Sequence, residues 1–534
     1  MQLPPPSKIT DAQSLIELHE RLLFLRAYPP NASALKQVEN QLRQIKKTVE
    51  RLQQADVDLS PLDEPEVSGI TGTSVTSNFS YALVRWLVRK YRRQVSIDWD
   101  WFEEEERFGA TMPRFLPLLE EDSMVEAHVP YQEWLAAAKG RKNEVAWIVE
   151  QFESLNVTDK QKAEAYDSLK LHITWEFGPR SSRSEMKLPA RKIFFHDRPL
   201  IKRRDVSIVG EMNSPAIPIE RLKASAGEKI IDLARETSAV RYRELHGFTY
   251  GDPKRVLKAE FGRGVQVFVM GVPPEYRLPL RAYHAAMIFK NGVPVAYFEG
   301  LSLCERMESG FNLYYTFRDG ETAWLYARIL RLLRQLLGVT VISIDPYQVG
   351  HENEEGIESG AFWFYRKLGF RPVKPELMRL TLAEEKKMAT NRDYRSSLPT
   401  LRRLADGHMI FELSPETTRG AWDRFTARKV GLAVQKRMAR DFASDARAIR
   451  AASVASVTRA LSMQLNRLTK VEEAALEHLA LPLAMIPDFK RWNDSQMQLA
   501  AQIIRAKAGN DEARYLKLMQ KHAALRRALI RLGS

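Results

Sequence analysis

Residues 359–370 have the sequence Ser-Gly-Ala-Phe-Trp-Phe-Tyr-Arg-Lys-Leu-Gly-Phe, and they give the clearest local structure in this 534-residue chain. A run of aromatic and apolar residues that ends in glycine and one more apolar residue is typical of a helix with a Schellman stop. We expect Gly369 to adopt the left-handed conformation, since glycine lacks the Cβ atom that penalises it. Phe370 would then pack back on the last turn, so the end of this helix is well defined.

The segment in front of this helix predicts a strand, a helix and a second strand. Residues 311–317 have the character of a strand, and 318–320 form a turn. In 321–337 apolar residues recur three and four positions apart, which indicates an amphipathic helix. A strand over 340–345 and an acidic loop follow. The order is therefore strand, helix, strand, helix.

This order, together with Phe-Tyr-Arg-Lys-Leu-Gly-Phe at 364–370, resembles the GNAT superfamily of N-acetyltransferases. The resemblance covers about residues 230–382. It implies an α+β fold in which a GNAT-like mixed sheet with packed helices holds acetyl-CoA or another acyl-CoA as co-substrate. The implied activity is acyl transfer from coenzyme A to an amine, on a small molecule or a protein. Neither the acceptor nor the length of the acyl chain is specified.

The chain is too long for one hydrophobic core, and its composition suggests four segments. We predict an α-helical N-terminal domain (1–160), an extended connector with short strands (161–227), the GNAT-like acyltransferase domain (228–382) and a basic α-helical C-terminal domain (383–534). The GNAT-like domain should contain a helix over 228–245 and strands over 265–271, 283–290, 294–304 and 309–317. Asn291-Gly292 predicts a tight hairpin between two of these strands.

The bulk composition is that of an ordinary globular protein, with 44% hydrophobic residues. No run of eighteen apolar residues occurs, and the N-terminus lacks the charged and apolar regions of a signal peptide. The one cysteine, Cys304, lies in an apolar strand and is expected in the core. We therefore expect a cytoplasmic protein without a membrane partner.

Positive charge is concentrated in the last part of the chain. Residues 381–534 contain 28 Lys and Arg against 16 Asp and Glu, which accounts for twelve of the fourteen net positive charges. Such an excess can attract nucleic acid, acidic proteins or a membrane surface, and charge alone does not select among them. However, residues 448–468 carry Arg without the interleaved aromatic residues of a single-strand binder. We therefore favour a helical accessory or dimerisation bundle, through which the chain could form a homo-oligomer. Its helices are expected over 419–440, 444–463, 470–479, 494–508 and 511–532.

The expected coenzyme site lies at the start of the helix 321–337, because pyrophosphate binds unpaired backbone N–H groups at a helix N-terminus. The resemblance places its contacts at Arg318, Gly320, Glu321, Thr322 and Ala323. Gly320 would let the backbone approach the phosphates closely, although the family spacing is matched only approximately. Asp319 and Glu321 bring negative charge that opposes phosphate binding unless it is offset. The alternative is a turn that no longer binds coenzyme, in which Asp319 caps the helix.

Two further site residues come from the resemblance. Tyr365 matches the family tyrosine that protonates the leaving thiolate, a task that a phenol can perform as a general acid. Asn353 lies where the family often places a polar contact to the coenzyme. Tyr365 fits a core position equally well, because its helix is apolar nearly all round. Residue chemistry points to Glu299, at the end of a central strand, as the base for the amine, with Asp345 and His351 behind it; no metal site is predicted.

A second function class is compatible with the same residues, because a fold does not guarantee an activity. It is a non-catalytic GNAT-fold scaffold whose basic helical tail binds an acidic partner or nucleic acid. The acidic, glycine-poor turn at 318–323 favours this alternative. Motifs of serine hydrolases, P-loop proteins and zinc fingers are absent from the sequence, and Gly262-Arg-Gly264 precedes a strand rather than the helix that a dinucleotide fingerprint requires.

Overall fold

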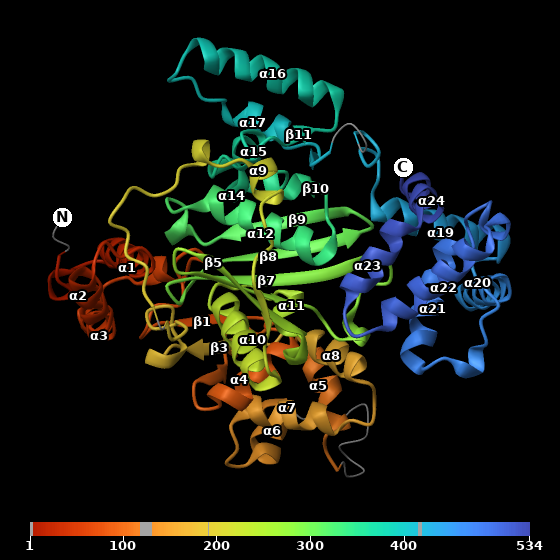
Figure 1. Ribbon diagram of the computed structural model, residues 1–534. Coiled ribbons are helices and arrows are strands. Elements are labelled where there is room, and N and C mark those ends of the chain that lie inside the picture. Colours follow the sequence, from red (N-terminus) through yellow and green to blue (C-terminus); the bar gives the residue numbers. More distant parts are fainter. Residues whose placement is uncertain (1–3, 118–130, 191, 415–418) are drawn as a thin grey trace. The chain divides into compact units, whose positions relative to one another are not determined.

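The computed structural model describes residues 4–117, 131–190, 192–414 and 419–534, which divide into two compact units (Figure 1). Unit 1 consists of Met1–Asp197, Ile230–Thr249 and Asn291–Pro294, and unit 2 of Arg198–Lys229, Tyr250–Lys290 and Val295–Ser534. Both contain helices and strands, so the expected α+β class is confirmed. Of the helices described, none has the length and apolar character needed to cross a bilayer.

Unit 1 packs helices around a small antiparallel sheet of order β1-β3-β2. Its strands are β1 (Ser74–Ser77), β2 (Val95–Ile97) and β3 (Ile173–Glu176). Its helices are α1 (Ala12–Ala27), α2 (Ala32–Leu42), α3 (Ile45–Gln54), α4 (Tyr81–Tyr91), α5 (Glu105–Thr111), α6 (Tyr131–Lys139), α7 (Glu144–Ser154), α8 (Asp159–Asp167) and α11 (His246–Thr249), together with the second half of α10 (Ala224–Ala239). The core is aromatic, with Trp175 packed edge-on against Trp86 at 6.2 Å.

The expectation of a purely helical segment over 1–160 differs from this structure. Both β1 and β2 fall inside that segment, and they pair with β3 from the predicted connector. These strands have only four and three residues, which is too short for an alternating pattern to stand out in the sequence.

Unit 2 is organised around a nine-stranded sheet of order β11-β12-β10-β9-β8-β7-β6-β5-β4. Its strands are β4 (Ile219–Arg221), β5 (Val256–Gly262), β6 (Val265–Met270), β7 (Ala282–Lys290), β8 (Val293–Leu303), β9 (Arg306–Leu313), β10 (Val341–Ile344), β11 (Arg371–Pro372) and β12 (Met409–Glu412). β9 and β10 are parallel, whereas β8 and β9 are antiparallel, so the sheet is mixed as expected. Every residue of β7 is buried, as befits a central strand covered on both faces.

The helices of unit 2 pack beside this sheet and beyond it. They are α9 (Ile208–Met212), α12 (Thr322–Leu337), α13 (Pro346–Val349), α14 (Glu354–Glu358), α15 (Ala361–Arg366), α16 (Pro375–Thr390), α17 (Leu398–Leu404), α19 (Ala427–Asp441), α20 (Ala446–Ala460), α21 (Lys470–Leu483), α22 (Asp494–Ala508), α23 (Glu512–Lys521) and α24 (Ala523–Gly533). In Figure 1 the last six (blue) gather at one end of the sheet, and α23 contacts β7 and α12.

The centre of the chain follows the predicted order closely, except that three strands, β5, β11 and β12, were not predicted. The predicted elements over 265–271, 283–290, 294–304, 321–337 and 340–345 correspond to β6, β7, β8, α12 and β10. β9 is shifted toward the N-terminus, and Tyr315–Phe317 form a short 3-10 helix instead of continuing the strand. β5, which is interrupted by charged residues, and the four-residue β12 were missed. β12 extends the sheet past residue 382, where the GNAT-like domain was expected to end.

The C-terminal helices differ from the prediction at two breaks. The helix expected over 470–479 continues through Pro482 to Leu483, where proline lies in the last turn and costs only one hydrogen bond. The helix expected over 511–532 is two helices, α23 and α24, because the His522 side chain caps the second by accepting a hydrogen bond from Leu525 N at 3.2 Å.

The two local signals that were strongest in the sequence are confirmed. Gly369 has a φ of +102°, Gly369 N donates to Arg366 O at 3.1 Å, and Phe370 N donates to Tyr365 O at 3.2 Å. This is the hydrogen-bond pair of a Schellman stop. At the hairpin, Asn291 and Gly292 have φ values of +49° and +81°, and two positive φ angles define the type I′ turn that joins β7 to β8.

Gly292→Ala should destabilise the protein more than a positive φ alone explains. A Cβ atom at position 292 would lie 2.2 Å from Leu188 O, so that strain and overpacking add to about 2–4 kcal/mol. Gly140→Ala is the control in the same unit, because Gly140 has a φ of +53° but nothing within 4 Å of its Cβ position, and it should cost about 1 kcal/mol. Urea unfolding followed by tryptophan fluorescence measures both. If both variants lose the same free energy of unfolding, Leu188 can shift to make room for the new methyl group at position 292.

Candidate functional site

The candidate site is built around a gap between the parallel strands β9 and β10. These strands pair only where Arg306–Glu308 face Val341–Ser343. β10 ends at Ile344, and Asp345 turns the chain into α13 by accepting a hydrogen bond from Tyr347 N at 3.0 Å. Residues 309–313 of β9 therefore extend beyond the last pair on this side, while β8 pairs with β9 along its full length on the other. The main chain of 309–313 keeps one edge available for hydrogen bonds.

The start of α12 lies at the same end of the sheet. After the 3-10 helix, Gly320 N donates to Phe317 O at 2.9 Å, and the Thr322 hydroxyl donates to Arg318 O at 3.1 Å. The backbone amides of Thr322, Ala323 and Trp324 have no hydrogen-bond acceptor among the described residues. These amides carry the positive end of a sixteen-residue helix dipole, which is suited to an anion.

Glu321 precedes these amides but points its carboxylate away from them into a buried cluster. The carboxylate is 1% exposed, lies 3.4 Å from the Lys290 ammonium, and accepts hydrogen bonds from Arg263 Nε at 3.2 Å and from Ile201 N at 3.2 Å. Burial alone would raise the pKa of Glu321, but the Arg263 hydrogen bond and the Lys290 charge bring it below its usual value. The negative charge of Glu321 is thus neutralised inside the protein, and its side chain is not available to a coenzyme. Asp319 stays exposed and does not cap the helix, because the N-cap position of α12 is Glu321, without a side-chain cap hydrogen bond.

Two other predicted coenzyme contacts are also engaged by the protein. Arg318 forms an ion pair with Glu355 and lies over the Tyr315 ring at 5.2 Å. Asn353 caps α14, accepting a hydrogen bond from Gly356 N at 3.4 Å and donating to Tyr347 O at 2.9 Å. Arg318 is half-buried and could exchange its carboxylate for a phosphate, whereas Asn353 holds the loop after β10 in shape.

Tyr365 lies in an aromatic cluster on one face of the gap. Its ring meets the Tyr326 ring at 5.7 Å and the Phe370 ring at 5.5 Å, both edge-on. The Tyr326 hydroxyl is 3.1 Å from the hydroxyl of Ser309, the first β9 residue beyond the paired segment. Burial raises the pKa of Tyr365 well above its usual value, and its hydroxyl has no hydrogen-bond partner among the described residues. Tyr365 is thus a core residue with a protonated hydroxyl, and it is linked to β9 through the Tyr326 ring.

Glu299 lies on the other face of the same strand pair. It is paired with Gly310 of β9, and because neighbouring strand residues point to opposite faces, its side chain is opposite to that of Ser309. Its carboxylate accepts a hydrogen bond from the Tyr283 hydroxyl, which fixes its orientation. His351 and Asp345 are not behind it in a relay, since His351 pairs with Asp406 at 3.2 Å and Asp345 caps α13.

The structure therefore brings part of the predicted set together. The α12 amides and the unpaired part of β9 lie at the same end of the sheet, Tyr365 packs on Tyr326 next to Ser309, and Glu299 lies on the opposite face of the β8–β9 pair, whereas the side chains of Glu321 and Asn353 serve the fold. Sequence reasoning missed Arg263, Lys290 and Tyr326, which fix the start of α12 and its contact with β9. The one available signal was Lys290 at the end of a mainly apolar strand, because a lysine that is buried there requires a carboxylate partner.

Comparison with known proteins identifies no relative. No family model, no curated protein and no solved structure matches this chain.

Proposed function

We propose that unit 2 is an acyl-CoA-dependent N-acyltransferase of GNAT type. The observation that carries the proposal is the parallel pair β9–β10, which separates beyond Glu308 at the end of the sheet where the α12 amides begin. The pyrophosphate of acetyl-CoA would bind the amides of Thr322 and Ala323, and its pantetheine amides would bind the open edge of β9. Acetyl-CoA or a longer acyl-CoA is the donor, and the acceptor is an amine.

The proposed chemistry is direct attack of the amine on the thioester. Backbone N–H groups of β9 polarise the thioester oxygen as its negative charge develops. Glu299 takes the proton of the amine, directly or through one water, and Tyr365 donates to the sulfur as the thiolate leaves. The two residues lie on opposite faces of the strand pair, which suits an acceptor and a donor that approach the gap from different sides.

Acetyl-CoA titrated calorimetrically into the full chain should bind with a Kd below about 1 mM, the affinity at which binding supplies roughly 4 kcal/mol. Thr322→Asp provides the sharper test. A carboxylate in the first turn stabilises a helix but repels a pyrophosphate, so the helix effect and the ligand effect have opposite signs. We expect binding to weaken about tenfold or more, a loss of roughly 1.4 kcal/mol. The thermal stability should change little, because the favourable charge in the first turn offsets the lost hydrogen bond from the Thr322 hydroxyl to Arg318 O.

Thr322→Asn is the matched control, because asparagine has the same shape as aspartate without the charge. It should change the affinity by less than about threefold. Two results would show that the acyl donor does not bind at the start of α12. One is the absence of binding heat when acetyl-CoA is titrated into the wild-type protein, and the other is equal affinity of the Asp and Asn variants for acetyl-CoA.

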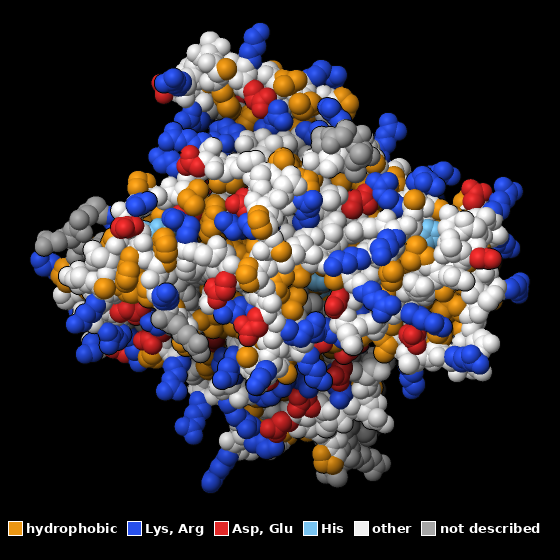
Figure 2. All heavy atoms as spheres, in the orientation of Figure 1, with side chains coloured by type: hydrophobic (Ala, Val, Ile, Leu, Met, Phe, Trp, Pro, Cys, Tyr) orange, Lys and Arg blue, Asp and Glu red, His pale blue; other side chains and the backbone are white. Residues whose placement is uncertain are grey.

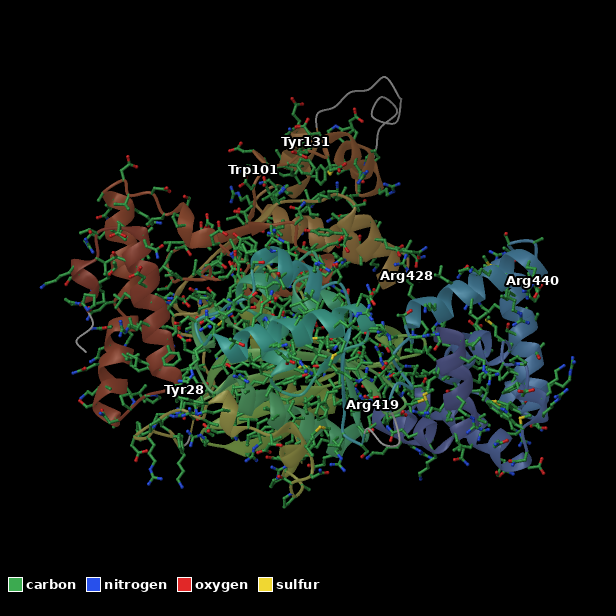
Figure 3. All side chains as sticks on the ribbon, turned by 90° about the horizontal axis from the view of Figure 1, so that it is seen from above. Tyr28, Trp101, Tyr131, Arg419, Arg428 and Arg440 are labelled. Carbon is green, nitrogen blue, oxygen red and sulfur yellow. The ribbon has the colours of Figure 1, made fainter. Side chains whose placement is uncertain are left out.

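A non-catalytic scaffold is the second candidate, and the engagement of Glu321, Arg318 and Asn353 by the protein favours it. Its basic tail would bind an acidic partner or nucleic acid. Arg428 and Arg440 lie near opposite ends of α19 and both are exposed (Figure 3). On the face shown in Figure 2, Lys and Arg side chains are scattered among other residues and form no continuous stripe. This distribution suits a protein partner better than a nucleic-acid backbone.

A further inference from the structure

A cavity of about 350 Å³ lies in unit 2 at the other end of α12 from the proposed acyl-donor site. Its walls come from the ends of strands β4 to β7, the last turn of α12 and the first turn of α23. Sixteen helical residues rise about 24 Å, so the cavity is far from the Thr322 amides. It is therefore a separate place in the molecule, and nothing in the proposed transfer uses it.

The charges around this cavity do not balance. Arg255 pairs with Asp252 at 2.9 Å, and Glu512 pairs with Lys507 at 2.5 Å, so these four groups cancel. Three further lining cations, Arg221, Arg277 and Lys517, face one further lining carboxylate, Asp511. Two positive charges are thus left over in a concave site, where the low-dielectric walls strengthen their attraction for an anion.

Arg277 supplies the most deeply placed of these charges. It is 9% exposed, and its guanidinium donates to the backbone oxygens of Val272, Lys507 and Gly509 but to no carboxylate among the described residues. Three carbonyls fix its position without neutralising its charge. A rigid guanidinium that donates to no carboxylate, at the wall of a cavity, is suited to an oxyanion.

His284 adds a second, independent observation. It is 8% exposed, lines the cavity, and its Nδ1 has no hydrogen-bond partner among the described residues. Buried polar atoms in native proteins nearly always have a partner. Burial lowers the pKa of His284, so that the ring is neutral at pH 7 and does not cancel the need for an anion in the cavity. Leu257, Val269 and Leu336 provide an apolar wall.

We propose that this cavity binds a small organic acid, whose oxyanion pairs with Arg277, Arg221 and Lys517 and whose apolar body lies against Leu257. At about 30 Å³ per non-hydrogen atom the space accepts roughly a dozen such atoms. An acyl-CoA is far larger, so the ligand is a second molecule and not the acyl donor. The acid is a carboxylate or a phosphate ester, since both place oxygens on a guanidinium in the same way.

The test titrates four probes calorimetrically into the full chain. 3-Phenylpropionate and phenyl phosphate carry the two oxyanions on one apolar body, 3-phenylpropionamide is a neutral match of the same size, and inorganic phosphate lacks the body. We expect at least one of the two aromatic anions to bind at least about tenfold more tightly than the amide and than inorganic phosphate. The tighter of the two identifies the oxyanion. If neither aromatic anion binds more tightly than both the amide and inorganic phosphate, the proposal is overturned.

Variants then locate the binding. Arg221→Gln combined with Lys517→Gln removes two exposed charges without touching the core, and should weaken the aromatic anion at least about tenfold. Arg514→Gln is the control, because Arg514 is exposed on α23 but does not line the cavity. An unchanged affinity in the double variant would place the binding elsewhere. Displacement of the anion by acetyl-CoA would also contradict a separate site, whereas failure of acetyl-CoA to bind at all leaves this test intact.

Discussion

Glu321→Gln is expected to lower the stability of unit 2 by about 3–5 kcal/mol at pH 7, the cost of breaking a buried ion pair by removing one partner. Lys290 is fully buried and Glu321 is 1% exposed, so the ammonium would lose the carboxylate that faces it and could not turn toward water. Arg263 has a side chain that is 28% exposed and can turn outward when the carboxylate is gone. The loss therefore falls mainly on Lys290.

The pH dependence of stability gives a second readout of this cluster. Burial lowers the pKa of Lys290 to about 8, although Glu321 pulls it upward. Since the unfolded chain holds this proton up to about pH 10.5, it binds more protons than the folded chain between about pH 8 and 10.5, and stability should rise with pH across that window. In Glu321→Gln the negative charge that raises the pKa of Lys290 is gone, so the increase of stability with pH should begin below pH 8.

Hydrogen exchange of peptides from β7 and α12 measures this effect without assuming that the two units unfold together. Lys290→Met combined with Glu321→Leu is the control, because replacing both partners by apolar residues of similar size removes the unpaired charge. This double variant should recover at least half of the protection against hydrogen exchange that Glu321→Gln loses. Faster exchange in the double variant than in Glu321→Gln would show that Lys290 is not the origin of the cost.

The same cluster explains what the sequence could and could not predict. The hairpin at Asn291-Gly292 and the stop at Gly369 depend on backbone conformations that few residues adopt, so the residue types specify them locally. The side-chain partners of Glu321 come from the turn after β5 and from the last residue of β7, far away in the chain. Whether its carboxylate faces a ligand or the core depends on which strands lie beside the helix, and a local pattern does not contain this information.

Tyr365 is a second example of what the sequence could not decide. Its aromatic neighbours correctly indicated a buried position, yet burial does not separate a core tyrosine from a proton donor. What separates them is the partner of each hydroxyl. Tyr326 in the same cluster uses its hydroxyl on Ser309 at 3.1 Å, whereas the Tyr365 hydroxyl has no such partner among the described residues. Two tyrosines of equal burial are thus expected to behave differently when the hydroxyl is removed.

Tyr365→Phe should lower the rate of thiol release from acetyl-CoA about a hundredfold, with the thermal stability unchanged, because the ring keeps its packing. A hundredfold loss of rate is at the low end of what removal of a general acid usually causes. Burial raises the pKa of Tyr365 above that of a thiol, so the phenol stabilises the leaving thiolate by a hydrogen bond rather than by complete proton transfer. Free thiol is measured with water or a panel of small amines as the acceptor.

Tyr326→Phe is the matched control for this measurement. It removes the hydroxyl paired with Ser309 and leaves a buried hydroxyl unsatisfied, which costs about 1–3 kcal/mol of stability. Its rate of thiol release should stay within about threefold of wild type, since it keeps the donor at 365. The two variants are therefore expected to separate, one losing rate and the other losing stability. Equal rates for wild type and Tyr365→Phe would make Tyr365 a packing residue and would leave the open edge of β9 as the only support for catalysis at this gap.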